Sequence, residues 1–167
     1  MKYGVLSYLP VNENVLMLKK SERKEDPNSG FYALPGGKLE PYEKNCKEGR
    51  LSAAVRETRE ETGLTLIKPK LIGTILFDNF EREFKEWKKH DNYHVSIFYA
   101  NEYSGTLLDE TEEGKPLWVQ RKDIPSLRMN SGDKKMYEWI FDGRSFSGVI
   151  YHKGKELDLE KTWVDFF

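Results

Sequence analysis

The segment between Leu34 and Leu64 constrains the fold more than any other part of this 167-residue chain. A short apolar run at 31–34 stops at the turn Pro35-Gly36-Gly37. Apolar side chains then recur at three-to-four residue spacing over 47–62, which predicts a helix with one buried face. Gly63 stands where a helix C-terminus is expected. The segment therefore predicts a turn, a loop and a helix packed through one face.

The predicted helix carries three carboxylates on one side. Glu57 lies three residues before Glu60 and four before Glu61, and both spacings place side chains on the same helix face. Like charges at these spacings repel each other, whereas a hard divalent cation with oxygen ligands removes the repulsion. Arg56 can hold one carboxylate in place through paired hydrogen bonds. The pattern indicates a cation site, and a solvated acidic face is the alternative.

The Gly36-Gly37 turn favours the cation site over the solvated face. Glycines let a backbone pass close to a ligand and present its carbonyl and amide groups. Because the helix follows this turn after a loop, the backbone of the turn and the helix carboxylates can share one metal. Mg²⁺ is the expected ion, with Mn²⁺ as the alternative.

The rest of the chain predicts a mixed set of strands and one further helix. Segments with strand-like patterns lie at 3–8, 15–18, 71–77, 93–100, 117–120 and 148–152. Residues 131–141 predict the second helix, and the highly charged 78–92 predicts a loop or a short exposed helix. No repeat or linker divides the chain, so 1–167 is expected to form a single α+β domain with a mixed sheet.

Composition excludes several classes of function. The net charge is −1, from 27 basic and 28 acidic residues, so a long nucleic acid is not an expected partner. No apolar run approaches the length that spans a bilayer, so no membrane partner is expected. The lone Cys46 permits no disulfide within the chain, which agrees with a reducing compartment, and we predict a cytoplasmic protein.

The glycine turn and the helix together resemble the Nudix box, G-x5-E-x7-R-E-U-x-E-E-x-G-U, where U is a bulky aliphatic residue. The positions that match are Gly37, Glu48, Arg56, Glu57, Glu60, Glu61, Gly63 and Leu64. The preceding Leu34-Pro35-Gly36-Gly37 is similar to the same region of MutT-like members. This resemblance implies the Nudix α/β/α sandwich with a mixed sheet.

Two positions depart from the box. Ten residues separate Gly37 from Glu48 instead of five, an apparent insertion at 42–46. Glu43 has the regular spacing from Gly37 but lies too far from Arg56, so we assign the first box glutamate to Glu48. Thr58 stands where the family has an aliphatic residue.

The family's chemistry implies the roles of the acidic residues. Metal ions are expected on Glu57, Glu60 and Glu61, together with the Gly37 carbonyl and Glu48. Glu113, on a segment similar to an acidic loop of MutT-type enzymes, is a further metal ligand or a group that orients water. A turn with solvated acids is the alternative for Glu113. Catalysis is assigned to Glu57, Glu60, Glu61, Arg56 and Glu113.

The resemblance also implies a substrate-binding side, which is less specific than the box. Asp133 lies near the place where 8-oxo-dGTP diphosphatases carry paired aspartates that read the base, although a residue at a helix start is an equal interpretation. Phe31, Tyr32 and Trp118 are candidates to stack on a base, with core packing as the alternative. The expected substrate-binding residues are Phe31, Tyr32, Gly36, Gly37, Lys38, Trp118 and Asp133.

The implied function is hydrolysis of a pyrophosphate bond in a small nucleotide. A nucleoside triphosphate such as 8-oxo-dGTP is the first expectation, with a nucleoside monophosphate and pyrophosphate as products. Alternatives are ADP-ribose, a nucleotide sugar, a dinucleoside polyphosphate, or a module that binds nucleotides without catalysis. RNA decapping is not indicated, because the basic cluster at 85–89 is too short for a track that binds RNA. The chain is expected to be a monomer or a homodimer, and its aromatic tail, 163–167, docks on the core or forms a dimer contact.

Overall fold

The fold is taken from a computed structural model that describes residues 1–24, 28–40, 47–83, 86–89 and 92–167. Side chains are described for these residues except 47–48, 80–83 and 86–89. The helices are α1 (Lys47–Thr62), α2 (Ser131–Asp142) and a 3₁₀ helix (Arg121–Ser126). The strands are β1 (Lys2–Tyr8), β2 (Pro10–Val11), β3 (Asn14–Lys20), β4 (Tyr32–Ala33), β5 (Gly36–Lys38), β6 (Leu64–Ile67), β7 (Lys70–Glu83), β8 (Glu86–Lys89), β9 (Tyr93–Tyr99), β10 (Glu102–Gly105), β11 (Gly114–Gln120), β12 (Phe146–Lys153), β13 (Glu156–Leu157) and β14 (Trp163–Phe166).

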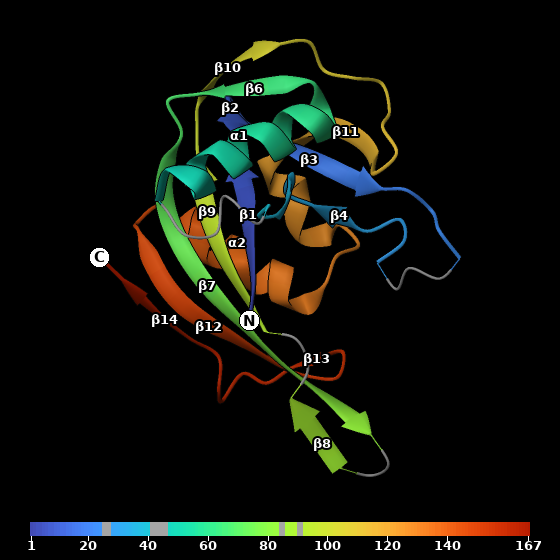
Figure 1. The fold of residues 1–167 in the computed structure, drawn as a ribbon, viewed down its shortest axis with the longest axis vertical. Coiled ribbons are helices and arrows are strands. Elements are labelled where there is room, and N and C mark those ends of the chain that lie inside the picture. Colours follow the sequence, from blue (N-terminus) through green and yellow to red (C-terminus); the bar gives the residue numbers. More distant parts are fainter. Residues whose placement is uncertain (25–27, 41–46, 84–85, 90–91) are drawn as a thin grey trace.

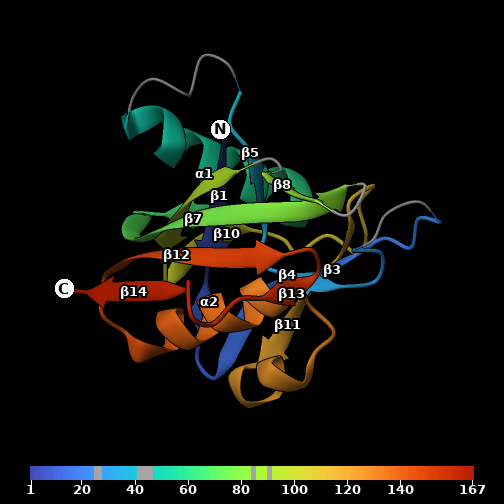
Figure 2. The same ribbon diagram turned by 90° about the horizontal axis from the view of Figure 1, so that it is seen from below.

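A large mixed sheet lies at the centre of the molecule, in the order β13-β12-β7-β9-β1-β5. The pairs β1–β9 and β7–β12 are parallel, and the other pairs along this order are antiparallel. Helix α1 lies on one side of this sheet and α2 on the other (Figure 2). A smaller sheet, β11-β3-β2 with β4 on β3, packs beside them (Figure 1). The predicted α+β class and α/β/α layering are confirmed.

Helix α1 packs on the sheet through small side chains. Ala53 and Ala54 are fully buried against Val5, Leu39 and Phe98. Short side chains let the helix approach β1 and β5 closely. The Gly36-Gly37 turn, which forms part of β5, therefore lies beside α1.

The polar residue in the aliphatic position of the box is explained by its partner on β1. Thr58 is fully buried, and its hydroxyl donates a hydrogen bond of 2.8 Å to the Ser7 Oγ atom. The Thr62 hydroxyl in turn donates to the Thr58 carbonyl at 2.6 Å. A buried hydroxyl is stable only with such a partner, so Thr58 and Ser7 form a matched pair.

The main core lies between the other face of the sheet and α2. It joins Ile75, Phe146 and Ile150 from the sheet to Met136 and Ile140 from the helix. Gly143 ends α2 in a left-handed conformation, with φ of 87°. No helix of the described residues has the length and apolarity needed to cross a membrane.

The prediction for residues 78–92 is wrong over 78–83 and 86–89, where β7 and β8 pair antiparallel and project from the sheet (Figure 1); residues 84–85 and 90–91 lie outside the described residues. The register places Glu81 opposite Lys88 in this pair of strands. High charge density therefore does not prevent strand formation here. The aromatic tail forms β14, which pairs with β12, and Phe166 packs against the main core. Docking of the tail is thereby confirmed.

Candidate functional site

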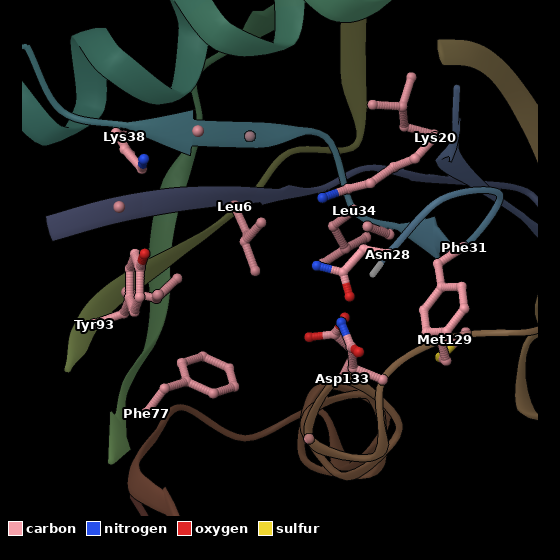
Figure 3. A pocket seen from close by; sticks show the side chains of 18 of the residues that line it. Leu6, Lys20, Asn28, Phe31, Leu34, Lys38, Phe77, Tyr93, Met129 and Asp133 are labelled. Atoms are coloured by element: carbon pink, nitrogen blue, oxygen red, sulfur yellow. The ribbon is translucent and has the colours of Figure 1, made fainter. Parts of the chain in front are cut away.

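An open cleft of about 1680 Å³ runs between the large sheet, the start of α2 and the glycine turn. Its floor is the face of the sheet toward α2, where Leu6, Phe77, Tyr93 and Val95 line it. One end is acidic, with Glu57, Glu60, Glu61 and Glu113. The far end is formed by Phe31, Met129 and Asp133 beside this apolar floor (Figure 3).

The three box glutamates are held at the acidic end by two partners. The Arg56 guanidinium donates to Glu57 at 2.9 Å and to Glu60 at 3.2 Å. The backbone N–H of Gly36 donates to the Glu61 carboxylate at 2.7 Å. The sequence predicted that Arg56 positions one carboxylate, and in the structure it contacts two. The glycine turn positions the third.

Both glycines of the turn are required by close contacts. A Cβ atom on Gly37 would lie 2.5 Å from the Glu57 Cδ and 2.7 Å from its Oε1. At Gly36 φ is +154°, and a Cβ would lie 2.9 Å from the Leu6 Cα atom. A side chain at position 36 would meet the backbone of β1, and one at position 37 would meet the Glu57 carboxylate, so the turn lies against β1 on one side and against a glutamate of α1 on the other.

The register corrects which glycine presents its carbonyl to the acidic end. Gly37 pairs with Val5 on β1, and its carbonyl oxygen lies 3.2 Å from the Cβ position of Gly4, so it faces β1. In an antiparallel pair, successive residues direct their N–H and C=O groups alternately toward the partner strand and away from it. The N–H and C=O of Gly36 therefore face away from β1, and the bond from its N–H to Glu61 agrees with this. We therefore move the predicted metal-facing carbonyl from Gly37 to Gly36.

Burial raises the pKa of Glu61 to about 8 from its ordinary value of 4.5. The hydrogen bond from Gly36 opposes this rise, whereas the charges of Glu57 and Glu113 add to it. A nearby cation would favour the ionised form and reverse the effect. Glu61 is thus a carboxylate whose ionisation the protein alone disfavours near neutral pH.

This pKa predicts the pH dependence of stability without metal. Because the folded pKa lies above the unfolded one, Glu61 contributes its full stabilisation below pH 4.5 and loses it as the pH rises to about 8. With metal removed by a chelator, the Tm of the wild type should fall relative to that of Glu61→Gln across this window. Thermal unfolding at closely spaced pH values measures the difference. Parallel curves for the two proteins would contradict the prediction.

The residues at the acidic end fit a hard divalent cation. Among the described side chains, no three carboxylates or imidazoles already converge on one point. The donors are nevertheless all oxygens from one helix face and one backbone turn, which suits Mg²⁺ or Mn²⁺. A positive charge there would also offset the free-energy cost of burying the ionised Glu61 carboxylate.

Glu113 and Glu48 complete the predicted acidic set. Glu113 is exposed at the cleft, close enough for its charge to affect Glu61. Its loop is fixed by the bond from the Ser21 N–H to the Glu113 carbonyl, at 3.0 Å. Glu48 lies in the first turn of α1, and its side chain is outside the described residues.

The predicted substrate-binding residues divide into two groups. Phe31, Lys38 and Asp133 line the cleft, and the Arg128 guanidinium lies 4.7 Å from the centre of the Phe31 ring. Trp118 does not line it, because strand alternation pairs it with Leu16 and turns it to another cluster, where it contacts Tyr103. The stacking role predicted for Trp118 is therefore corrected to core packing.

Tyr32 also lies outside the cleft lining and packs at the edge of the main core, so it too is reassigned to packing. Burial raises the pKa of Asp133 to about 6, against the opposing effects of Lys20 and a hydrogen bond with Asn130. Asp133 is thus a carboxyl group at the far end of the cleft whose pKa lies closer to neutral pH than that of an ordinary aspartate.

Several lining residues were not predicted from the sequence. Lys20, Asn28 and Phe77 project into the cleft (Figure 3), and the Lys20 charge acts on both Glu61 and Asp133. Asn79, Tyr93 and His152 also line it. All three lie on strands of the large sheet, β7, β9 and β12, and no local sequence pattern marks them as cleft residues.

Comparisons with known proteins agree with this geometry. The NUDIX domain family model matches residues 2–140. A Bacillus subtilis protein named as an uncharacterized Nudix hydrolase, YvcI, is 32% identical over 159 residues, which cover 94% of this chain and 90% of that protein. An oxidized purine nucleoside triphosphate hydrolase of Danio rerio is 30% identical over 109 residues, 65% of this chain and 64% of the fish protein.

Solved structures show the same fold. A mutator MutT protein from Bacillus halodurans superimposes with a TM-score of 0.80 at 26% identity, covering 99% of this chain and 98% of that one. The NUDIX domain of Shewanella oneidensis NrtR, solved with ADP-ribose, gives a TM-score of 0.63 at 16% identity, covering 86% and 88%. With the family model matching most of its length, this chain belongs to the Nudix family and is a hydrolase that acts on nucleotide pyrophosphate bonds.

Proposed function

We propose that the protein hydrolyses a nucleoside triphosphate, normal or oxidised, to a nucleoside monophosphate and pyrophosphate in a Mg²⁺-dependent reaction. The observation that supports this most is that one cleft has an acidic end and, away from it, an apolar floor. Its acidic end suits a metal and phosphates, and its apolar floor and far end suit a nucleobase. The names of the Danio rerio relative and the Bacillus halodurans structure agree with a triphosphate substrate.

The chain's own residues divide the chemical work. Glu57, Glu60 and Glu61, with the Gly36 carbonyl, would hold the metal, which supplies Lewis-acid activation of phosphate and water. Arg56 keeps Glu57 and Glu60 in place and is not among the residues that line the cleft. One of the box glutamates, or Glu113, accepts the proton of the attacking water.

Basic and aromatic side chains bind the rest of the substrate. Lys20 and Lys38 line the cleft, and their charges would balance those of the phosphate chain. Phe31, Phe77 and Tyr93 offer rings for contact with the base. We further propose a cytoplasmic enzyme, monomeric or homodimeric.

A hydrolysis panel tests the proposal. Normal and oxidised deoxynucleoside triphosphates, ADP-ribose, nucleotide sugars and dinucleoside polyphosphates are incubated with the protein, and the products are separated by chromatography. We expect the highest kcat/KM with a triphosphate, release of pyrophosphate, loss of activity with a chelator and recovery with Mg²⁺ or Mn²⁺. Preference for ADP-ribose or a nucleotide sugar would replace the proposed substrate. No hydrolysis with any compound would favour a binding module.

A further inference from the structure

Gly132 and His152 fit each other at the far end of the cleft. Gly132 is the second residue of α2, and a Cβ atom there would lie 2.5 Å from the His152 Cε1 and 2.7 Å from its Nε2. The imidazole therefore occupies the space that a side chain at position 132 would fill. The polar ring of His152 and the carboxyl group of Asp133, the residue after Gly132, both line the cleft.

The position of His152 on β12 explains why it reaches the cleft. Phe146 and Ile150 occupy the same face of β12 and are buried under α2. His152 is the next residue of that row, and it lies where α2 begins and the cleft opens. Its ring is nearly parallel to that of Phe77, at 7° and 6.4 Å between centres, so an apolar neighbour fixes its plane.

Hydrogen bonding assigns the two ring nitrogens different roles. The Nδ1 atom lies 3.1 Å from the Asn79 side-chain oxygen, which only accepts, so Nδ1 carries the hydrogen. Burial lowers the pKa of His152, which keeps the ring neutral near pH 7. The Nε2 atom is then an acceptor, and no donor in the described part of the chain bonds to it. It is also not sealed from solvent.

We propose that His152 reads the nucleobase of the substrate, with its Nε2 atom accepting a hydrogen bond from a ring or exocyclic N–H of the base. The preferred substrates are then nucleotides whose base presents such a donor beside Asp133. The Asn79 bond and the Phe77 ring hold the imidazole in the required tautomer and plane. This inference rests on the proposed function, because it requires the base to lie at this end of the cleft.

Binding of nucleoside monophosphates without metal tests the inference directly. GMP, IMP, AMP, CMP and 8-oxo-dGMP are titrated into the protein by calorimetry with a chelator present, so that the acidic end contributes little. The wild type should discriminate among the bases. His152→Phe keeps a ring beside Phe77 and Gly132 but removes the acceptor, and it should reduce the ratio of Kd values between the best and worst bases about tenfold.

Two further variants separate base reading from packing. Gly132→Ala leaves His152 in the sequence but displaces its ring, so it should reduce the same ratio. His94→Phe is the matched control: His94 alternates with Tyr93 on β9, packs beside Tyr3 and does not line the cleft, so the ratios should stay as in the wild type. Thermal unfolding of each variant shows that the fold is retained.

Three results would overturn the inference. They are equal base ratios in His152→Phe and the wild type, a uniform loss of affinity for every base, and a wild type without base preference. The hydrolysis panel separates this failure from that of the proposed function. A wild type that hydrolyses triphosphates but has ratios independent of His152 rejects only the base reader. A wild type with no hydrolysis but His152-dependent binding rejects only the proposed reaction.

Discussion

Replacement of Glu60 or Glu61 by glutamine is expected to lower kcat by roughly two to four orders of magnitude while the fold stays intact. Glutamine has nearly the same shape as glutamate, and at position 61 it can still accept the hydrogen bond from Gly36. What it removes is the negative charge that would bind the metal or take a proton. Steady-state kinetics with the best panel substrate, together with thermal unfolding, measures both effects.

The matched control for these variants is Glu138→Gln. Glu138 is exposed on α2 in an ion pair with Lys135 and lies outside the cleft lining, so its replacement should leave kcat unchanged. Near-normal turnover in both purified variants, Glu60→Gln and Glu61→Gln, would remove the basis for the assigned site. A loss that is recovered fully by raising the Mg²⁺ concentration would assign the residue to metal affinity alone.

Gly37→Ala is expected to reduce kcat about a hundredfold through displacement of one carboxylate. The new Cβ atom would lie 2.5 Å from the Glu57 Cδ, so Glu57 must leave its place beside Arg56. Because the φ of Gly37 does not lie in the left-handed region, alanine adopts the backbone conformation without strain. The contacted atoms belong to the end of a side chain that can move, so the Tm should change little.

Gly143→Ala is the control for this variant. Gly143 has φ of 87°, but no atom lies within 4 Å of its Cβ position. Alanine there should cost about 1 kcal/mol of stability and leave turnover unchanged. The two substitutions are thus expected to differ in effect: Gly37→Ala lowers activity, and Gly143→Ala lowers stability. Wild-type kcat in Gly37→Ala would show that Glu57 is not required in its observed position.

The acidic end of the cleft could be predicted from the sequence because its geometry is local. Three glutamates at spacings of three and four share a helix face whatever the helix packs against, and the helix itself follows from the apolar spacing over 47–62. The adjoining glycines indicate a close approach of backbone. The sequence alone did not show which glycine faces the glutamates, because that depends on the register of β5 on β1.

The far end of the cleft was decided by tertiary structure. Lys20, Phe77 and His152 come from three strands that are distant in the chain, and only the sheet order and the position of α2 bring them together. Trp118 shows the same dependence, because a shift of one residue along β11 would have turned it to the opposite face. Local spacing therefore specifies chemistry carried by one helix, whereas pairing between distant strands, which no short segment encodes, decides which side chains line the far end of the cleft.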